Sequence, residues 1–320
     1  MAFARWLLGF LLLADGWEYR PELGYVHAET LDRYGPQEFY EFGLALAKES
    51  RTDEALEVFS LVAVHGPEPG LKEKAFYKRA EALWSAARYG DSHRAFEAFV
   101  TRYPDSERAD RAKERAMWCA LQLARVGAPR SLLGVIPAGT TSSDGVELLR
   151  EFLRRYPRES FSAKYYLLLG EFLLESGEEA EAEAEFTILI ESYNDPASRA
   201  YAARALVHLA EVEMKRFRGL EYDARPLREA KRHYQRYLDT EGFRTLNPTL
   251  TRYVEQRLEE IDGRLAEQHF RVAEYYASRG WEGAARLYLE TLPKMYPGTA
   301  WARLAARRLQ EKDGEGGGSP

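Results

Sequence analysis

Cysteine is almost absent from this chain, which has Cys119 as its only one in 320 residues. One cysteine excludes a disulfide framework within the chain and a cysteine-based zinc cluster. Basic residues are the minority among the charges, with 45 Lys and Arg against 51 Asp and Glu and a net charge of −6. This balance argues against a nucleic-acid partner, because general nucleic-acid binders rely on neutralising phosphates.

Motifs that carry catalysis are missing as well. The sequence contains no Gly-x-Gly-x-x-Gly, no phosphate-binding loop, no His-Glu-x-x-His and no Gly-x-Ser-x-Gly. Its six histidines lie far apart, and none has a second His or a Cys at metal-ligand spacing. Cys119, beside Trp118 in a helical pattern, is expected to be a small buried apolar side chain. We therefore predict no enzyme, no catalytic residues, no metal and no cofactor, with an unrecognised active site as the alternative.

Long apolar runs are also missing. The run at residues 6–14, which follows Arg5, is far shorter than the roughly 20 residues that span a bilayer. A short basic start before such a run is typical of a secretory signal, so residues 1–20 are assigned as a signal or apolar N-terminal segment. Because no cysteine follows, we expect export to the cell envelope without acylation. The alternatives are an apolar first turn that packs on the domain, or a misplaced start codon, in a cytoplasmic protein.

What the chain does contain is helical periodicity between residues 36 and 312. Apolar residues recur there at spacings of three and four, and strand-like alternation is absent. One register recurs, in which a first position is followed by a second after twelve residues and by a third after four more. The sets are Gly43, Ala55 and Phe59; Leu83, Ala95 and Phe99; Gly170, Ala182 and Phe186; and Ala273, Ala285 and Leu289. Each set brackets a polar or glycine-containing turn, at residues 50–53, 88–91, 175–178 and 278–281.

Each unit is therefore predicted to be a helix, a tight turn and a second antiparallel helix. Small residues at facing positions let the two backbones approach, while Phe or Leu fills the groove beside them. Prolines that stop the second helices follow at Pro67, Pro104, Pro157, Pro196 and Pro297. This pattern predicts an all-α array of tetratricopeptide-like (TPR-like) helix-turn-helix repeats, a solenoid, with little or no strand. An irregular helical bundle is the alternative.

Some segments depart from the repeat. Long loops are expected at residues 127–143 and 218–226, one long helix at residues 251–278, and a disordered tail at residues 313–320. Charge is uneven: residues 165–198 carry acidic and no basic side chains, whereas residues 215–236 are mainly basic. The two stretches form either two ordinary solvated helix faces or a bipolar surface that steers charged partners.

The C-terminal half carries motifs of a known family. They are Arg257-Leu258, residues 264–266, 272–276, 279–280 and 296–299, a loop at residues 217–223, and an inter-repeat stop at residues 156–160. A similar stop lies outside this half, at residues 103–106. With these, residues 146–310 resemble BamD, the TPR-containing lipoprotein of the bacterial outer-membrane β-barrel assembly machine. The chain departs from that family in lacking an N-terminal cysteine for acylation. It also has Leu287-Tyr288 where the family often has Asn-Arg.

The resemblance implies a protein–protein interaction scaffold of the cell envelope that supports outer-membrane β-barrel assembly. It implies protein partners, such as the periplasmic domains of the barrel assembly catalyst, and peripheral membrane association through a partner. The alternative is a TPR adaptor of another periplasmic or cytoplasmic complex, for example one acting on the cell wall. The partner-binding residues are expected in the C-terminal unit, and they are Arg264, Tyr275, Tyr276, Arg279 and Trp281.

Overall fold

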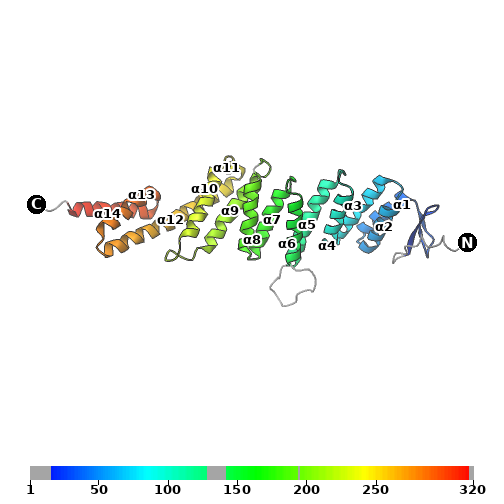
Figure 1. The fold of residues 1–320 in the computed structure, drawn as a ribbon, viewed down its shortest axis with the longest axis horizontal. Coiled ribbons are helices and arrows are strands. Elements are labelled where there is room, and N and C mark those ends of the chain that lie inside the picture. The colour runs from blue at the N-terminus through cyan, green and yellow to red at the C-terminus, as the bar shows by residue number, and fades with distance from the viewer. Residues whose placement is uncertain (1–15, 128–141, 194, 317–320) are drawn as a thin grey trace, which may run out of the picture. The chain divides into compact units, whose positions relative to one another are not determined.

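The computed structural model describes residues 16–127, 142–193 and 195–316 (Figure 1). The apolar run at residues 6–14 and most of the loop expected at residues 127–143 lie outside the described residues. The described chain forms two compact units, Met1–Ser162 and Ala163–Pro320. Each unit is dominated by antiparallel helices that pack against their neighbours in sequence, so the expectation of an all-α, TPR-like repeat fold is confirmed.

The first unit combines a small sheet with helix pairs. Its elements are β1 (Trp17–Arg20), β2 (Gly24–His27), β3 (Arg33–Tyr34), α1 (Pro36–Lys48), α2 (Thr52–His65), α3 (Pro69–Ser85), α4 (Tyr89–Arg102), α5 (Ala109–Gly127) and α6 (Ser142–Arg155). Proline is the first residue of α1 and α3, where its missing N–H has no helical partner to lose.

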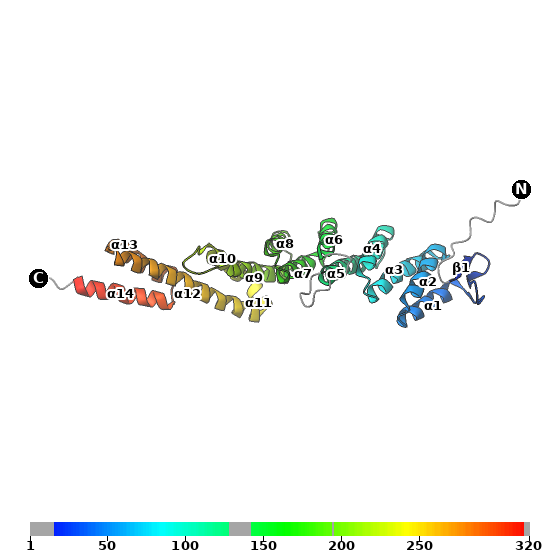
Figure 2. The same cartoon turned by 90° about the horizontal axis from the view of Figure 1, so that it is seen from below.

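The second unit is built around one long helix. Its elements are α7 (Ser162–Glu175), α8 (Glu179–Ser192), α9 (Arg199–Arg216), α10 (Arg225–Asp239), α11 (Phe243–Leu246), α12 (Pro248–Ser278), α13 (Glu282–Met295) and α14 (Ala300–Gly316). The long helix expected at residues 251–278 is α12, and α13 and α14 pack against it (Figure 2). Helix α14 extends to Gly316, into the segment expected to be tail.

The little strand that the described residues contain lies before the helical array, at residues 17–34, which agrees with the expectation of little or no strand. There β1, β2 and β3 form a three-stranded antiparallel sheet, with Trp17 opposite His27 and Tyr25 opposite Tyr34. The strands are two to four residues long, which is too short for alternation to be visible in the sequence. Residues 17–20, counted above in the N-terminal segment, are strand β1.

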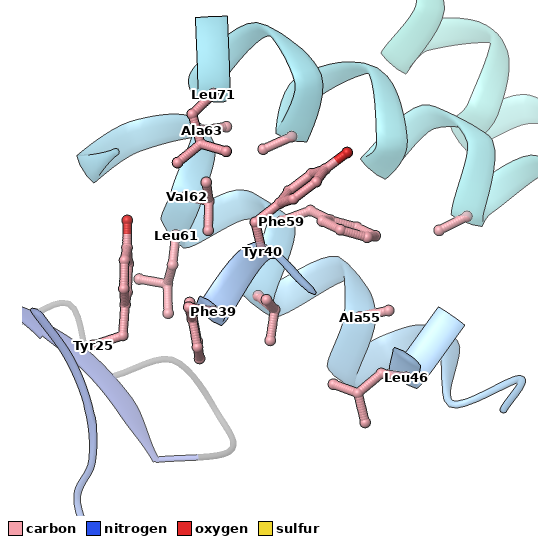
Figure 3. Packing of buried hydrophobic residues seen from close by; sticks show 13 residues of the cluster. Tyr25, Phe39, Tyr40, Leu46, Ala55, Phe59, Leu61, Val62, Ala63 and Leu71 are labelled. Atoms are coloured by element: carbon pink, nitrogen blue, oxygen red, sulfur yellow. The ribbon is translucent and has the colours of Figure 1, made fainter. Parts of the chain in front are cut away.

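The sheet is fixed to the first helix pair by aromatic packing. The ring of Tyr25, fully buried, stacks on that of Phe39 in α1 with centroids 4.3 Å apart. Trp17 packs against Phe39 and Phe42 at 4.9 and 5.7 Å. Figure 3 shows Tyr25 beside Phe39 and Leu61, in the same apolar cluster. The sheet therefore covers the end of the first helix pair.

The repeat register is confirmed in three pairs and wrong in one. A residue with positive φ stands two positions after the first helix of each pair: Ser50, Ala87, Gly177 and Gly280. In the α3–α4 pair this turn lies three residues earlier than expected, because residues 89–91 are already helix α4. The equivalent positions are therefore Ala80, Ser92 and Phe96 instead of Leu83, Ala95 and Phe99.

The packing at the register positions follows the sequence argument. Ala55, Ala182, Ala285, Phe59 and Phe186 are each 0% exposed. The predicted core residue Phe99 is also fully buried, although it lies one helical turn after the register position, Phe96. In the shifted pair the Ser92 hydroxyl donates to the Ala80 carbonyl at 3.0 Å, which marks the close approach of α3 and α4.

Glycine allows a close approach of the two helices in two of these pairs. A Cβ on Gly43 would lie 2.7 Å from Val58 and 2.9 Å from Phe59, and one on Gly170 would lie 2.4 Å from Phe186. These distances are below ordinary van der Waals contact, so only glycine fits beside the two phenylalanine rings.

An even closer approach at Gly145 gives a testable result. A Cβ there would lie 2.1 Å from the backbone nitrogen of Ala124, so α5 and α6 touch through their backbones. We expect Gly145→Ala to lower the free energy of unfolding by about 1–3 kcal/mol, because two helices must separate. Gly263→Ala is the control: its Cβ would meet nothing within 4 Å, and Ala stabilises a helix interior by up to about 1 kcal/mol. Urea denaturation measures both, and an equal change in the two variants would contradict the close approach.

Candidate protein-docking surface

Aromatic side chains gather where α12 turns into α13. The ring of Tyr276 is at the centre: it stacks on Trp281 at 5.6 Å and lies 5.5 Å from Tyr288. Tyr275 meets Tyr276 edge-on at 5.7 Å. We call Tyr275, Tyr276, Trp281 and Tyr288 the α12–α13 aromatic surface.

This surface is open to solvent. Tyr275 is 53% exposed and Trp281 is 59% exposed. Tyr276, which stacks on Trp281, and Tyr288 are half-buried. Large exposed aromatic side chains offer contact area at low cost in side-chain entropy, and they dominate protein–protein interfaces.

The local sequence fixes the arrangement. Gly280 has a φ of +75°, which lets the chain reverse, and the N–H of Trp281 donates to the carbonyl of Tyr276 at 3.0 Å. The two rings that stack are therefore joined through the backbone. Beneath them Ala273 and Ala285 are buried between α12 and α13, so the surface rests on a close helix pair.

Four of the five predicted partner-binding residues meet here. Tyr275, Tyr276 and Trp281 are in the surface, and the guanidinium of Arg279 lies 5.4 Å from the centre of the Tyr275 ring. Arg264 is not part of it. Its guanidinium binds Glu260 at 2.6 Å and lies over the ring of Phe217.

Sequence reasoning missed one member of the surface. Tyr288 was noted only as part of a departure from the BamD pattern. Tyr288 follows Trp281 by seven residues, two turns along a helix, and that spacing was the signal for a shared face.

The uneven charge is partly neutralised inside the second unit. Arg204 of α9 binds Glu171 of α7 at 2.5 Å, and Arg216 binds Glu183 of α8 at 2.7 Å. Two glutamates of the acidic stretch, Glu171 and Glu183, are therefore paired with arginines of α9, of which only Arg216 belongs to the basic stretch.

A partly buried polar cluster surrounds His208 beneath these ion pairs. Its Nε2 lies 3.0 Å from Glu171 and its Nδ1 lies 3.1 Å from Glu211, whose other oxygen accepts from the Tyr253 hydroxyl at 2.9 Å. Burial lowers the pKa of His208, but the hydrogen bonds and charges of the two carboxylates outweigh it and raise the pKa to about 9. At neutral pH His208 is therefore a charged imidazolium between two glutamates.

That arrangement makes stability depend on pH. In the folded protein His208 has a pKa of about 9, above the ordinary value near 6.5. Its charge therefore stabilises the fold fully below about pH 6.5, and this contribution is lost as the pH rises to about 9. We expect the free energy of unfolding to fall on the order of 2 kcal/mol across this window. In His208→Gln the decline should be largely absent, and an unchanged decline would assign it to another group. Denaturant titrations between pH 6 and 9.5 measure it.

The remaining candidates for chemistry have structural roles. Cys119 is fully buried as expected, and burial raises its pKa to about 11 even with a hydrogen bond to Ser92. It is therefore a thiol at neutral pH. Within the described ranges, no group of three His, Cys, Asp or Glu side chains is arranged to hold a metal.

None of the helices in the described part of the chain is long and apolar enough to cross a membrane.

Two solved structures of TPR proteins are distantly similar to this chain. No protein-family model matches the sequence, and no curated protein matches it. A thermophilic TPR protein of Thermus thermophilus is 19% identical, with a TM-score of 0.32 over 70% of this chain and 99% of its own. The C-terminal part of a TPR repeat-containing protein from Cytophaga hutchinsonii is 13% identical, with a TM-score of 0.23 over 83% and 98%. At these TM-scores the assignment to a TPR-like fold rests on the helix pairs described above.

Proposed function

We propose that the protein is a protein-interaction scaffold of the bacterial cell envelope. The observation that supports it is the α12–α13 aromatic surface, where Tyr275 and Trp281 are more than half exposed on a rigid helix pair. Arg279 at its edge adds a charge that affects association rate more than final affinity. Helical repeats of this kind serve as rigid platforms for partner chains.

Within this role we infer a BamD-like activity, in support of outer-membrane β-barrel assembly. The support is the sequence resemblance of residues 146–310, whose last repeat contains the aromatic surface. Membrane association is proposed to depend on a partner. The periplasmic domains of the barrel assembly catalyst are the proposed partner.

The experiment is co-purification of the full chain, tagged at its C-terminus, from gently solubilised native membranes. We expect the tagged chain in the envelope fraction, together with the barrel assembly catalyst. Protein found only in the cytosol would overturn the envelope assignment. Recovery in the envelope with a different complex, such as one acting on the cell wall, would retain the scaffold and overturn the BamD-like role.

A further inference from the structure

A second candidate site is a cavity within the second unit, apart from the aromatic surface. It has a volume of about 190 Å³ and lies where the end of α8 and the end of α10 meet the start of α9. Sites for whole small molecules usually have about 300–1,000 Å³. The cavity therefore has the size for one or two side chains of a partner.

Part of the cavity wall is apolar. Ile190, Tyr193, Leu206 and Phe243 line it, and each is 8% exposed or less. These side chains are held by the packing of α8, α9 and α11, so the hollow is preformed. An apolar side chain that enters it would leave water without requiring the protein to rearrange.

Two arginines stand at the cavity. Arg199 in the first turn of α9 and Arg236 near the end of α10 both line it, and both are exposed. The turn at Gly242, with a φ of +85°, brings the backbone beneath Arg199, since a Cβ there would lie 3.7 Å from its Nη1. Glu241 also lines the cavity, which leaves the lining with one net positive charge.

These arginines differ from the others on the same two helices. The others have acidic partners: Arg204 with Glu171, Arg216 with Glu183 and Glu213, Arg225 and Arg228 with Asp223, and Arg232 with Glu229. Among the arginines of α9 and α10, all of which are described, only Arg199 and Arg236 form no ion pair. The guanidinium charge that the fold leaves uncompensated on these helices is thus concentrated at the apolar hollow between them.

We propose that this cavity binds an extended segment of a partner protein in which an acidic side chain lies next to an apolar one. The guanidinium groups of Arg199 and Arg236 match a carboxylate, with which arginine forms paired hydrogen bonds. The neighbouring apolar side chain enters the hollow lined by Leu206 and Phe243. The site goes beyond the function proposed above, because it does not require a barrel assembly partner.

The test is fluorescence anisotropy with the full chain and a labelled peptide in which one glutamate is flanked by two leucines. Both peptide ends are blocked, so the side chain supplies the only carboxylate. We expect binding that weakens at high salt and that falls about tenfold in Arg236→Ala or Arg199→Ala, since a charge-assisted hydrogen bond is lost. Arg232→Ala, which removes the same charge from the same helix, should change it less than about twofold.

Two further peptides separate the sources of affinity. Replacing the glutamate by glutamine should weaken binding about tenfold, and replacing both leucines by serine should do the same. Three results would overturn the proposal: no binding of the glutamate peptide, equal losses in Arg232→Ala and Arg236→Ala, or full affinity of the glutamine peptide once its C-terminal carboxylate is free. The last result would mean that the site binds the C-terminal carboxylate of a chain instead of an acidic side chain.

Discussion

Replacing Phe186 by alanine is expected to lower the free energy of unfolding of the second unit by about 3–5 kcal/mol. The side chain is 0% exposed, lies over Gly170 and stacks on the ring of His208 at 5.2 Å. Truncation therefore removes apolar transfer energy and leaves a cavity between α7, α8 and α9. The surrounding helices cannot close it, because each is fixed by its own neighbours.

The control for this variant is Ile188→Ala on the same helix. Ile188 is 41% exposed, so its truncation is expected to cost less than about 1 kcal/mol. Urea denaturation followed by circular dichroism measures both variants, with separate transitions analysed if the two units unfold independently. If Phe186→Ala unfolded at the wild-type midpoint, α8 would not be packed in the register described here.

The success of the sequence argument at Phe186 has a physical reason. Helix pairs repeat, and each repeat applies the same requirement for a small residue opposite an aromatic one, so the signal at Gly170, Ala182 and Phe186 was reinforced by the other pairs. The error in the α3–α4 pair shows the limit of that signal. Ala80 and Leu83 lie on one face a single turn apart, and so do Phe96 and Phe99, so apolar spacing alone fits either register. The deciding feature, a positive φ at Ala87 instead of glycine, has no mark in the sequence.

Other features depended on contacts that no single segment encodes. The sheet at residues 17–34 forms because Tyr25 packs on Phe39 of the following helix, and tertiary packing of this kind overrides weak local patterns. At the docking surface the aromatics near Gly280 were predicted from the family resemblance and from the contact area that they offer. Arg264 lies apart from them, more than three turns earlier on α12, where Glu260 binds it. The cavity at Arg199 and Arg236 joins residues from separate helices and was not foreseen.

The second large effect is expected at Trp281, on binding instead of on folding. Trp281→Ala removes the most exposed ring of the α12–α13 aromatic surface, whose side chain is 59% exposed. Tryptophan at the centre of an interface contributes about 2–4 kcal/mol, so binding of a partner that docks here should weaken about 30-fold or more. The ring's contacts within the protein are few: it stacks on Tyr276, and its side chain makes no capping hydrogen bond at the start of α13. Loss of that stacking costs about 1 kcal/mol at most, a fall of a few degrees in Tm.

The matched control is Tyr222→Ala, which removes an aromatic ring that is 62% exposed in the same unit but outside the surface. Its melting temperature and its recovery of partner should both match wild type. The comparison is made by co-purification of the tagged full chain at equal expression, with thermal unfolding of each purified variant in parallel. Because Trp281 and Tyr222 are similarly exposed, general stickiness of the surface would reduce recovery in both variants alike. Equal recovery of partner in Trp281→Ala and wild type would move the contact away from α12 and α13. A large drop in Tm without loss of binding would show that Trp281 packs between the helices and does not face a partner.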